Sequence, residues 1–252
     1  MRLLLIFNLA GKVAALLLFS TAPAAAVLCW FAPDVWLAYN LFAHQSQGLV
    51  RTHRRFATDR REVWLTIDDG PDPEDTPRIL KLLAEHGAHA TFFVIGEKAA
   101  RHPALIDAIA GAGHEVGHHT HTHPIGTFWF ASPARVSREL DGALAVLREA
   151  GEKPTRFRPP AGVKNLWLEA ALRARGLTCI GWSARGRESW RGDPATVVSR
   201  VTRGLAPGSI LLLHEGPRVP PATRVTAISR VLERLREAGY RCVVPAPEQL
   251  VS

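Results

Sequence analysis

From residue 62 onward, short apolar runs alternate with stretches whose apolar residues recur with the period of a helix. Runs such as VWLTI at 63–67 and SILLL at 209–213 are typical of buried strands. The stretch that begins at Ser132 is typical of a helix, because it has a capping serine, a proline at the first helical position and an apolar stripe along one face. Strands that alternate with helices form parallel sheets with helical crossovers. The sequence therefore predicts an α/β domain, either a barrel or a doubly wound sheet.

Polar side chains at the ends of the apolar runs help to choose between these two folds. They are Asp68 and Asp69 after the first predicted strand, His119 and His123 after the third, Arg158 at the end of the fourth, Trp182 to Glu188 after the fifth, and His214 after the sixth. All of them lie at the carboxyl ends of predicted strands, where α/β barrels build their active sites. The pattern favours a barrel with a functional site at that end.

Two stretches of the chain contain residue types that bind metals. TIDDGPDP at 66–73 places two carboxylates side by side, and GHHTHTHP at 117–124 contains four histidines. Taken alone, the first predicts a turn and the second a loose, nonspecific metal binder. In combination, two imidazoles and one carboxylate could hold a divalent metal with open positions for water and substrate, as a hydrolytic metal site requires.

The spacing leaves open which histidines would be the ligands. His119 and His123 would project the same way from one helical turn, whereas His119, His121 and His123 would share one face of an extended segment. The extra histidines of the region, His114, His118 and, in the first case, His121, would support the site or lie at the surface.

Five motifs resemble those of the polysaccharide deacetylase family, carbohydrate esterase family four, in order and spacing. They are TIDDGP at 66–71, HTHTH at 119–123 after GHEVG, RFRPPAG at 156–162, GWSARGRE at 181–188 and LLLH at 211–214. The resemblance covers roughly residues 62–250, and the first two motifs together are highly specific. It implies a distorted (β/α)7 barrel and the metal-dependent removal of an N- or O-acyl group, usually an acetyl group of an amino sugar.

The resemblance also implies a metal centre. Asp69, His119 and His123 would be the ligands of one divalent ion, zinc or another transition metal. Such an ion lowers the pKa of a water toward ~7 and polarises an acyl carbonyl.

The same resemblance implies roles for five further residues. Asp68 would be the general base toward the attacking water, and Arg158 would orient it through an ion pair. His214 would be the general acid for the leaving amine, with Glu188 as its carboxylate partner, because a neighbouring carboxylate favours the charged imidazole. The backbone N–H of Ala161 would help to stabilise the oxyanion.

The chain departs from the family pattern in two motifs. Ala161 replaces the usual aromatic residue of motif three, which removes an expected surface for stacking a sugar ring. In motif four, Glu188-Ser189-Trp190 stands where an aspartate followed by tryptophan is usual. Trp182 and Trp190 could either pack in the core or contact substrate. Because no ligand, base or acid is lost, the departures bear on the substrate more than on the activity.

Residues 1–43 are expected to form a hydrophobic membrane segment. The uncharged run 13–33 is long enough to cross a bilayer, although Pro23 would interrupt or kink a helix there. A cleaved signal peptide is the alternative, because the small residues at 24–26 resemble a cleavage site. The apolar run VWLAYNLF at 35–42 favours a retained anchor, a hairpin or an interfacial segment. We therefore expect a membrane-associated protein.

Residues 44–61 are expected to be a basic linker ahead of a catalytic domain at 62–252. The arginines of this linker could contact anionic lipid head groups or remain solvated. Residues 1–61 supply +5 of the formal net charge of +8, so the domain itself is nearly balanced and nucleic acid is not an expected partner. The positive charges at 51–61 favour the cytoplasm, whereas a signal anchor would place the domain outside, so the side of the membrane is left open.

The sequence thus predicts a metal-dependent hydrolase that removes an acetyl or formyl group from an amino sugar in a polysaccharide or a lipid-linked glycan. The apolar segment, the arginines and the small domain favour the lipid-linked form. A second interpretation is a non-catalytic glycan-binding protein on the same barrel, against which the presence of both a base and an acid argues. A third is nonspecific metal storage by the histidine tract, which would not depend on Asp69.

Overall fold

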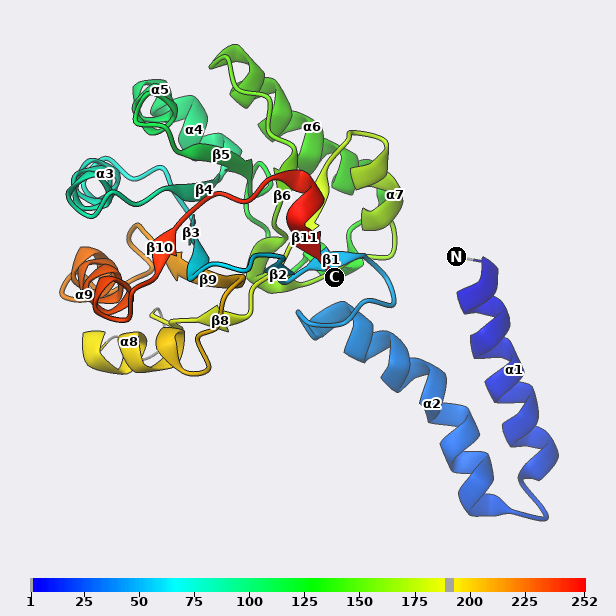
Figure 1. Ribbon diagram of the computed structural model, residues 1–252. Helices are drawn as coiled ribbons and strands as arrows, with labels where there is room; N and C mark the ends of the chain where they lie inside the picture. Colours follow the sequence, from blue (N-terminus) through cyan, green and yellow to red (C-terminus); the bar gives the residue numbers. More distant parts are fainter. Residues whose placement is uncertain (1, 189–192) are drawn as a thin grey trace.

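The computed structural model describes residues 2–188 and 193–252. Figure 1 shows an α/β domain around a curved sheet, and an N-terminal pair of helices that projects from it. Parallel strands form the centre of the sheet in the order β7-β6-β5-β4-β3-β9. Their bounds are β3 Glu62–Asp68, β4 Ala90–Val94, β5 Glu115–His118, β6 Arg156–Phe157, β7 Thr178–Ile180 and β9 Ser209–His214. The predicted alternation of strands and helices is confirmed.

One continuous segment nearly closes this sheet into a barrel. β7 pairs with β6, and after residues 181–183 the chain forms β8 (Ala184–Arg185), which pairs with β9 at the other end of the row. The remaining opening is filled by β1 (Thr52–His53) beside β7 and by β2 (Arg55–Phe56) beside β9. β11 (Leu250–Val251) then pairs with β2. The predicted distorted α/β barrel is therefore confirmed, and its irregularity is concentrated where these short strands meet.

Helices surround the outside of the barrel (Figure 1). They are α3 Asp75–Glu85, α4 Gly96–Arg101, α5 Pro103–Gly111, α6 Pro133–Glu149, α7 Leu168–Arg173, α8 Pro194–Thr202 and α9 Arg224–Glu237, with short 3-10 turns at Phe128–Phe130, Pro160–Gly162 and Pro247–Gln249. The expected cap of α6 is present, because the side chain of Ser132 accepts a hydrogen bond from the amide of Arg135. Asp193 caps α8 in the same way through the amide of Thr196.

The period of two along β3 sorts its side chains between two apolar regions. Val63, Leu65 and Ile67 face outward into a cluster shared with the helices, whereas Trp64 belongs to a cluster inside the barrel. Because side chains alternate along a strand, Asp68 continues the inward set that begins at Trp64. The strand therefore delivers this carboxylate to the interior at its carboxyl end.

Two regions differ from the expectation drawn from the sequence. The expected linker at 44–61 contributes β1 and β2 to the sheet, so this stretch is part of the barrel wall. RCVV at 241–244 has the apolar character of a last strand, but the strand observed there, β10 (Arg241–Cys242), is short and pairs with the beginning of β3. Two-residue strands carry no measurable period, which explains why the sequence pattern did not reveal β1 and β2.

The N-terminal segment is a helical hairpin, one of the arrangements expected from the sequence. α1 spans Arg2–Leu18 and α2 spans Pro23–Phe42, so Pro23 begins the second helix, where its missing N–H has no cost. Asp34 accepts a hydrogen bond from Asn8 and pairs with Lys12 across the hairpin. Among the described residues, α2 meets the length and composition expected of one membrane-spanning helix, a criterion that a signal sequence also satisfies.

We predict that Ser132→Ala lowers the melting temperature of the protein by about 2–4 °C. The substitution removes the acceptor for the Arg135 amide, and loss of such a cap costs about 1 kcal/mol. Thermal unfolding followed by circular dichroism would measure the shift. Ser229→Ala, within α9, is the matched control and should leave the transition in place; equal shifts in both variants would contradict the prediction.

Candidate active site

The two neighbouring aspartates enter the same pocket because the backbone turns between them. Asp68 is the last residue of β3 and is buried, and it lies opposite His214 in the register of β3 with β9. Asp69 has a φ of 74°, in the left-handed region. A strand continued through Asp69 would send its carboxylate to the opposite face, so the left-handed turn is what allows both carboxylates to line one pocket.

His119 and His123 meet through a turn that is neither helical nor extended. β5 ends at His118, and positive φ values of 64° at Thr120 and 57° at His123 fold the chain back on itself. The two Nε2 atoms lie 3.1 Å apart, and Nε2 of His123 is 3.1 Å from Oδ1 of Asp69. One ligand atom from each of Asp69, His119 and His123 lies within 4.8 Å of the others. The structure thus brings together the three residues that the sequence resemblance implied.

The donor atoms of this group suit a divalent ion. Oδ1 of Asp69 is buried without a hydrogen-bond partner among the described residues, an arrangement that is costly unless a cation neutralises it. His119 donates from Nδ1 to the backbone oxygen of Arg158 at 2.8 Å, which leaves its Nε2 free as a ligand. Burial, with a smaller contribution from His119, lowers the pKa of His123 to about 3, so its ring is neutral at physiological pH.

Arg218 is a further side chain at this site. Its guanidinium donates to Nδ1 of His123 at 2.8 Å, which assigns the ring proton to Nε2. A metal ligand needs the opposite tautomer, so binding of an ion would move that proton to Nδ1 and displace the guanidinium. No sequence motif points to Arg218. Its place in the loop that follows His214 is the feature that could have indicated a position near the site.

Asp68 is held by a buried arginine. Arg158 is fully buried and donates to Oδ1 of Asp68 at 2.6 Å and to the hydroxyl of Thr66 at 2.7 Å. Burial lowers the pKa of Arg158, while the charge of Asp68 opposes that shift. Removing one partner of such a pair leaves an uncompensated buried charge, at a cost of about 3–5 kcal/mol. The expected ion pair is present and fixes the orientation of the carboxylate.

His214 is held by a carboxylate on its other side. Nδ1 of His214 lies 3.0 Å from Oε2 of Glu188, whose Oε1 accepts from the His214 backbone amide at 3.2 Å. Burial lowers the pKa of His214, but Glu188, with smaller contributions from Asp68 and Asp69, outweighs this effect and raises it to about 9. The imidazole is therefore protonated at neutral pH, and its Nε2 is free to face the pocket.

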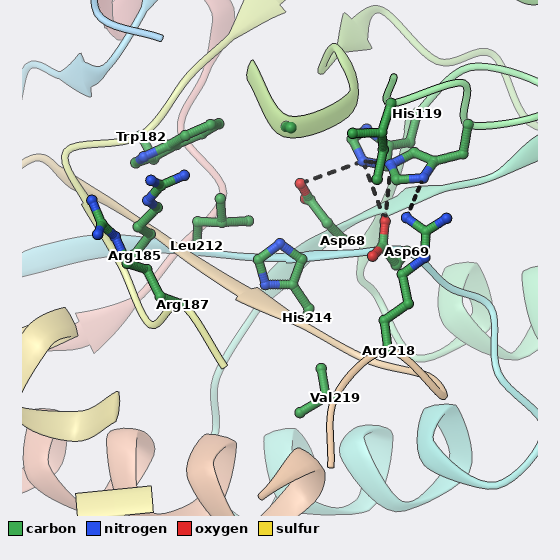
Figure 2. Close-up of a pocket in the computed structure, with 13 residues that line it drawn as sticks. Asp68, Asp69, His119, Trp182, Arg185, Arg187, Leu212, His214, Arg218 and Val219 are labelled. Carbon is green, nitrogen blue, oxygen red and sulfur yellow. Dashed lines mark hydrogen bonds and ion pairs between the residues drawn. The ribbon is translucent and has the colours of Figure 1, made fainter. Parts of the chain in front are cut away.

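These groups share one pocket of about 190 Å³. Figure 2 shows His214 and Asp68 near its centre, Arg218 and Asp69 at one end, and Trp182 with two arginines at the other. Ala161 also lines it, with a left-handed φ of 53°. The two arginines, Arg185 and Arg187, lie within motif four, but the resemblance to the family implied no catalytic or binding role for them.

The other histidines of the tract, His118 and His121, contact parts of the domain outside the candidate metal site. The buried His118 contacts the backbone oxygen of Leu140 and accepts from the amide of Thr120. His121 packs against Gly96 and Gly142, away from the metal ligands. Trp182 is buried and also lines the pocket, so it packs in the domain, and its contact with substrate stays a prediction. Trp190 lies outside the described residues.

Glu139 is a second residue of the site that the sequence motifs do not indicate. It is buried on α6 and accepts hydrogen bonds from the amides of His121 and Thr122, at 3.1 and 2.9 Å, and from the Thr122 hydroxyl at 2.6 Å. It therefore holds the turn between the two histidine ligands. Its position beside Leu140, within the apolar face of the helix, is a signal that could have revealed it.

A barrel that combines this carboxylate–histidine group with an arginine-bound aspartate and a glutamate-bound histidine has the features of a metal-dependent hydrolase. The chain belongs to the polysaccharide deacetylase family, whose model matches residues 56–180. Members of this family hydrolyse the amide bond of acetylated sugars.

Two curated relatives have known activities. A chitooligosaccharide deacetylase from Bradyrhizobium is 34% identical over 79% of this chain and 95% of its own length. A peptidoglycan-N-acetylglucosamine deacetylase from Bacillus cereus is 32% identical over 72% of this chain and 84% of its own length.

Solved structures show the same fold. A family 4 carbohydrate esterase from Streptomyces lividans, in complex with acetate, superposes with a TM-score of 0.68 and 30% identity, and the match covers 77% of this chain and 97% of that one. A family 4 pseudoenzyme from Bacillus anthracis gives a TM-score of 0.67 and 27% identity over 75% of this chain and 65% of that one. The fold alone therefore does not establish activity, which depends on the site residues.

We predict that Asp69→Ala and His119→Ala abolish stoichiometric metal binding, whereas His121→Ala retains it. The first two remove groups whose ligand atoms converge, and His121 faces α4 and α6. The measurement is the metal content of purified full-length protein by mass spectrometry. Retention of metal by Asp69→Ala, or its loss only in His121→Ala, would show that the ion binds elsewhere in the tract.

We also predict that Glu139→Gln weakens metal affinity by about 10–100-fold while the protein stays folded, because supporting residues of metal ligands have effects of this size. The amide keeps one acceptor oxygen for the two backbone N–H groups, but it loses the negative charge and places an NH2 donor where the Thr122 hydroxyl now donates. Competition with a fluorescent zinc chelator would measure the affinity. Glu149→Gln, exposed near the end of α6, should not change it; an unchanged affinity in Glu139→Gln would contradict the role of the carboxylate.

Proposed function

We propose that this chain is a metal-dependent deacylase of N-acylated amino sugars. The observation that carries the proposal is the register of β3 with β9, which places Asp68 opposite His214 beside the Asp69, His119 and His123 group. Amide hydrolysis needs a base for water and an acid for the leaving nitrogen at one reacting carbon. The relatives named above act on N-acetylated glycans, which supports an acetylated amino sugar as the substrate class.

The roles of base and acid follow from the partner of each group. Asp68, oriented by Arg158, accepts a proton from the attacking water. His214, paired with Glu188, holds a proton at Nε2 and donates it to the departing nitrogen. A divalent ion bound by Asp69, His119 and His123 would supply Lewis-acid activation of the water and the acyl carbonyl.

The pocket suits a small acyl group. Its apolar lining includes Ile125, Leu212 and Val219, and the N–H of Ala161 is the candidate donor for the oxyanion. A volume of about 190 Å³ fits an acetyl or formyl group together with part of one sugar ring.

The N-terminal hairpin supports a site of action at a membrane surface, on a polysaccharide or on a lipid-linked glycan. The end of α2 reaches the rim of the pocket, where Phe42 contacts Trp129 and His44 stacks on Trp182 at 4.6 Å between ring centroids. Next to it, Phe130 is 56% exposed, so apolar surface continues from the helix onto the domain. A hairpin retained as an anchor would hold the pocket close to the head groups.

A non-catalytic glycan-binding protein is the second candidate, because a pseudoenzyme shares the fold. A binding protein gains nothing from a buried base and a carboxylate-paired acid on neighbouring strands. The two candidates differ in turnover, which the following test measures.

We predict that the metal-loaded full-length protein releases acetate from N-acetylated chitooligosaccharides, and that Asp68→Asn lowers kcat by about 10²–10⁴-fold with the metal content unchanged. The amide keeps the shape of the carboxylate but cannot accept the proton. Acetate release and metal content would be measured on the same samples. Binding of the sugar without turnover by the wild type would favour the second candidate.

We further predict that the alkaline limb of the kcat/KM profile lies near the His214 pKa of about 9 and moves to lower pH in Glu188→Gln. The protonated imidazole is the active form, so activity is lost as pH rises through that pKa. Removing the carboxylate lowers the pKa and therefore the pH at which activity is lost. A limb that does not move would mean that another group donates the proton.

A further inference from the structure

A second hollow adjoins the catalytic pocket. Its volume is about 310 Å³, roughly ten times the share of one liquid water, so it can take a polyatomic group. Arg185, Arg187 and Trp182 line both hollows, so the second is continuous with the wall of the first. Arg200 and Arg203 complete the wall of the second hollow only. In Figure 2, Arg185 and Arg187 lie beside Trp182, at the end of the pocket away from Arg218.

The arginines of this hollow have no anionic partner. Among the ion pairs of residues 2–188 and 193–252, none includes Arg185, Arg187, Arg200 or Arg203. The neighbouring carboxylate, that of Glu188, is buried and bound to His214. Like charges gathered on one wall repel one another, and a bound anion would relieve that repulsion.

Two arginines elsewhere in this protein do have carboxylate partners. Arg156 pairs with Glu115 at 2.8 Å, and Arg175 forms a two-pronged pair with Asp141. In these two cases a carboxylate neutralises the guanidinium. The described residues around the second hollow provide no such carboxylate; Arg200 donates to the backbone oxygen of Gly186 at 3.4 Å, and the positive charge of the wall stays open to an anionic ligand.

His44 gives an independent indication at the same place. Its Nδ1 is buried without a hydrogen-bond partner among the described residues, while its ring stacks on Trp182. Burial lowers the pKa of His44 to about 4, and the charges of Arg185 and Arg54 add to the effect. An anion in the hollow would offer an acceptor to this nitrogen.

We propose that the arginine hollow binds a phosphate or diphosphate group carried by the amino sugar, so that the substrate is a sugar phosphate ester. The inference rests on the proposed function and deepens it by naming the substrate class. Several guanidinium groups around one volume match the many oxygens and the multiple charge of a phosphate better than the single charge of a carboxylate. His44 follows α2 closely, so the phosphate of a membrane lipid could reach the hollow.

Binding is tested first without turnover. Inorganic pyrophosphate is titrated into metal-free full-length protein by calorimetry, which keeps the metal site out of the measurement. We expect binding that weakens about tenfold in the Arg200→Gln/Arg203→Gln double variant, the loss expected for about 1.4 kcal/mol of charge-assisted contacts. Arg138→Gln, exposed on α6, is the matched control. No binding, or equal binding by the double variant, overturns the proposal.

Turnover assays then test whether the enzyme prefers a phosphate-bearing substrate, and whether that phosphate is soluble or lipid-linked. N-acetylglucosamine 1-phosphate, geranyl diphosphate-linked N-acetylglucosamine in micelles and neutral diacetylchitobiose are compared with metal-loaded enzyme. We expect kcat/KM for a phosphate-bearing substrate to exceed that for the neutral sugar by about tenfold or more, and this ratio to fall in the double variant. Preference between the first two substrates identifies a soluble or a lipid source.

The outcomes distinguish a failure of the phosphate inference from a failure of the proposed deacylase activity. Equal kcat/KM on phosphate-bearing and neutral sugars overturns the phosphate inference and leaves the deacylase in place. No turnover of any acylated sugar, with stoichiometric metal bound, overturns the proposed function and with it the substrate assignment.

Discussion

The charge of Arg158 must be solvated entirely by the barrel interior, and this requirement organises the site. Its polar contacts are the carboxylate of Asp68, the hydroxyl of Thr66, and the backbone oxygens of Ile180 and Gly181. Its own backbone accepts from His119 and donates to His118. One residue after β6 thus joins β3, β5 and β7. Because an unpaired buried cation costs several kcal/mol, a shift in strand register that broke this set would be strongly unfavourable. The positions of the proposed base, Asp68, and of one proposed metal ligand, His119, follow from the same requirement.

The proposed base and the proposed acid differ in the partner that holds each of them. Asp68 has a guanidinium beside it, and His214 has a carboxylate, although the two residues lie opposite each other on adjacent strands. The guanidinium orients the carboxylate that is proposed to accept a proton, and Glu188, against the effect of burial, raises the pKa of the histidine that is proposed to donate one. Opposite tasks are therefore assigned by pairs of ionic contacts on one rigid sheet.

The sequence was informative wherever a regular period or a strand end carried the signal. The continuous apolar run of β3 and the serine before α6 both predicted their local structures, and polar residues at strand ends predicted where the site lies. β1 and β2 were not predictable, because strands of two residues are defined by their partners and not by a pattern. Whether His121 joins His119 and His123 as a ligand was open for a similar reason: it depends on left-handed residues in a turn, which neither a helical nor an extended template describes.

Charge distribution is the property that the linear sequence concealed most completely. Residues 62–252 carry only a small formal excess, which excluded a large basic surface but said nothing of local concentrations. Folding places β8 beside the carboxyl end of α8, and arginines from both elements then share one hollow. Arg54, from the stretch expected to be a linker, bonds to the backbone oxygen of Trp182 near the same place. A domain with a nearly balanced net charge can therefore still gather several arginines in one hollow. Because this hollow adjoins the catalytic pocket, its positive charge can act on a substrate bound there, which the net charge of the domain does not indicate.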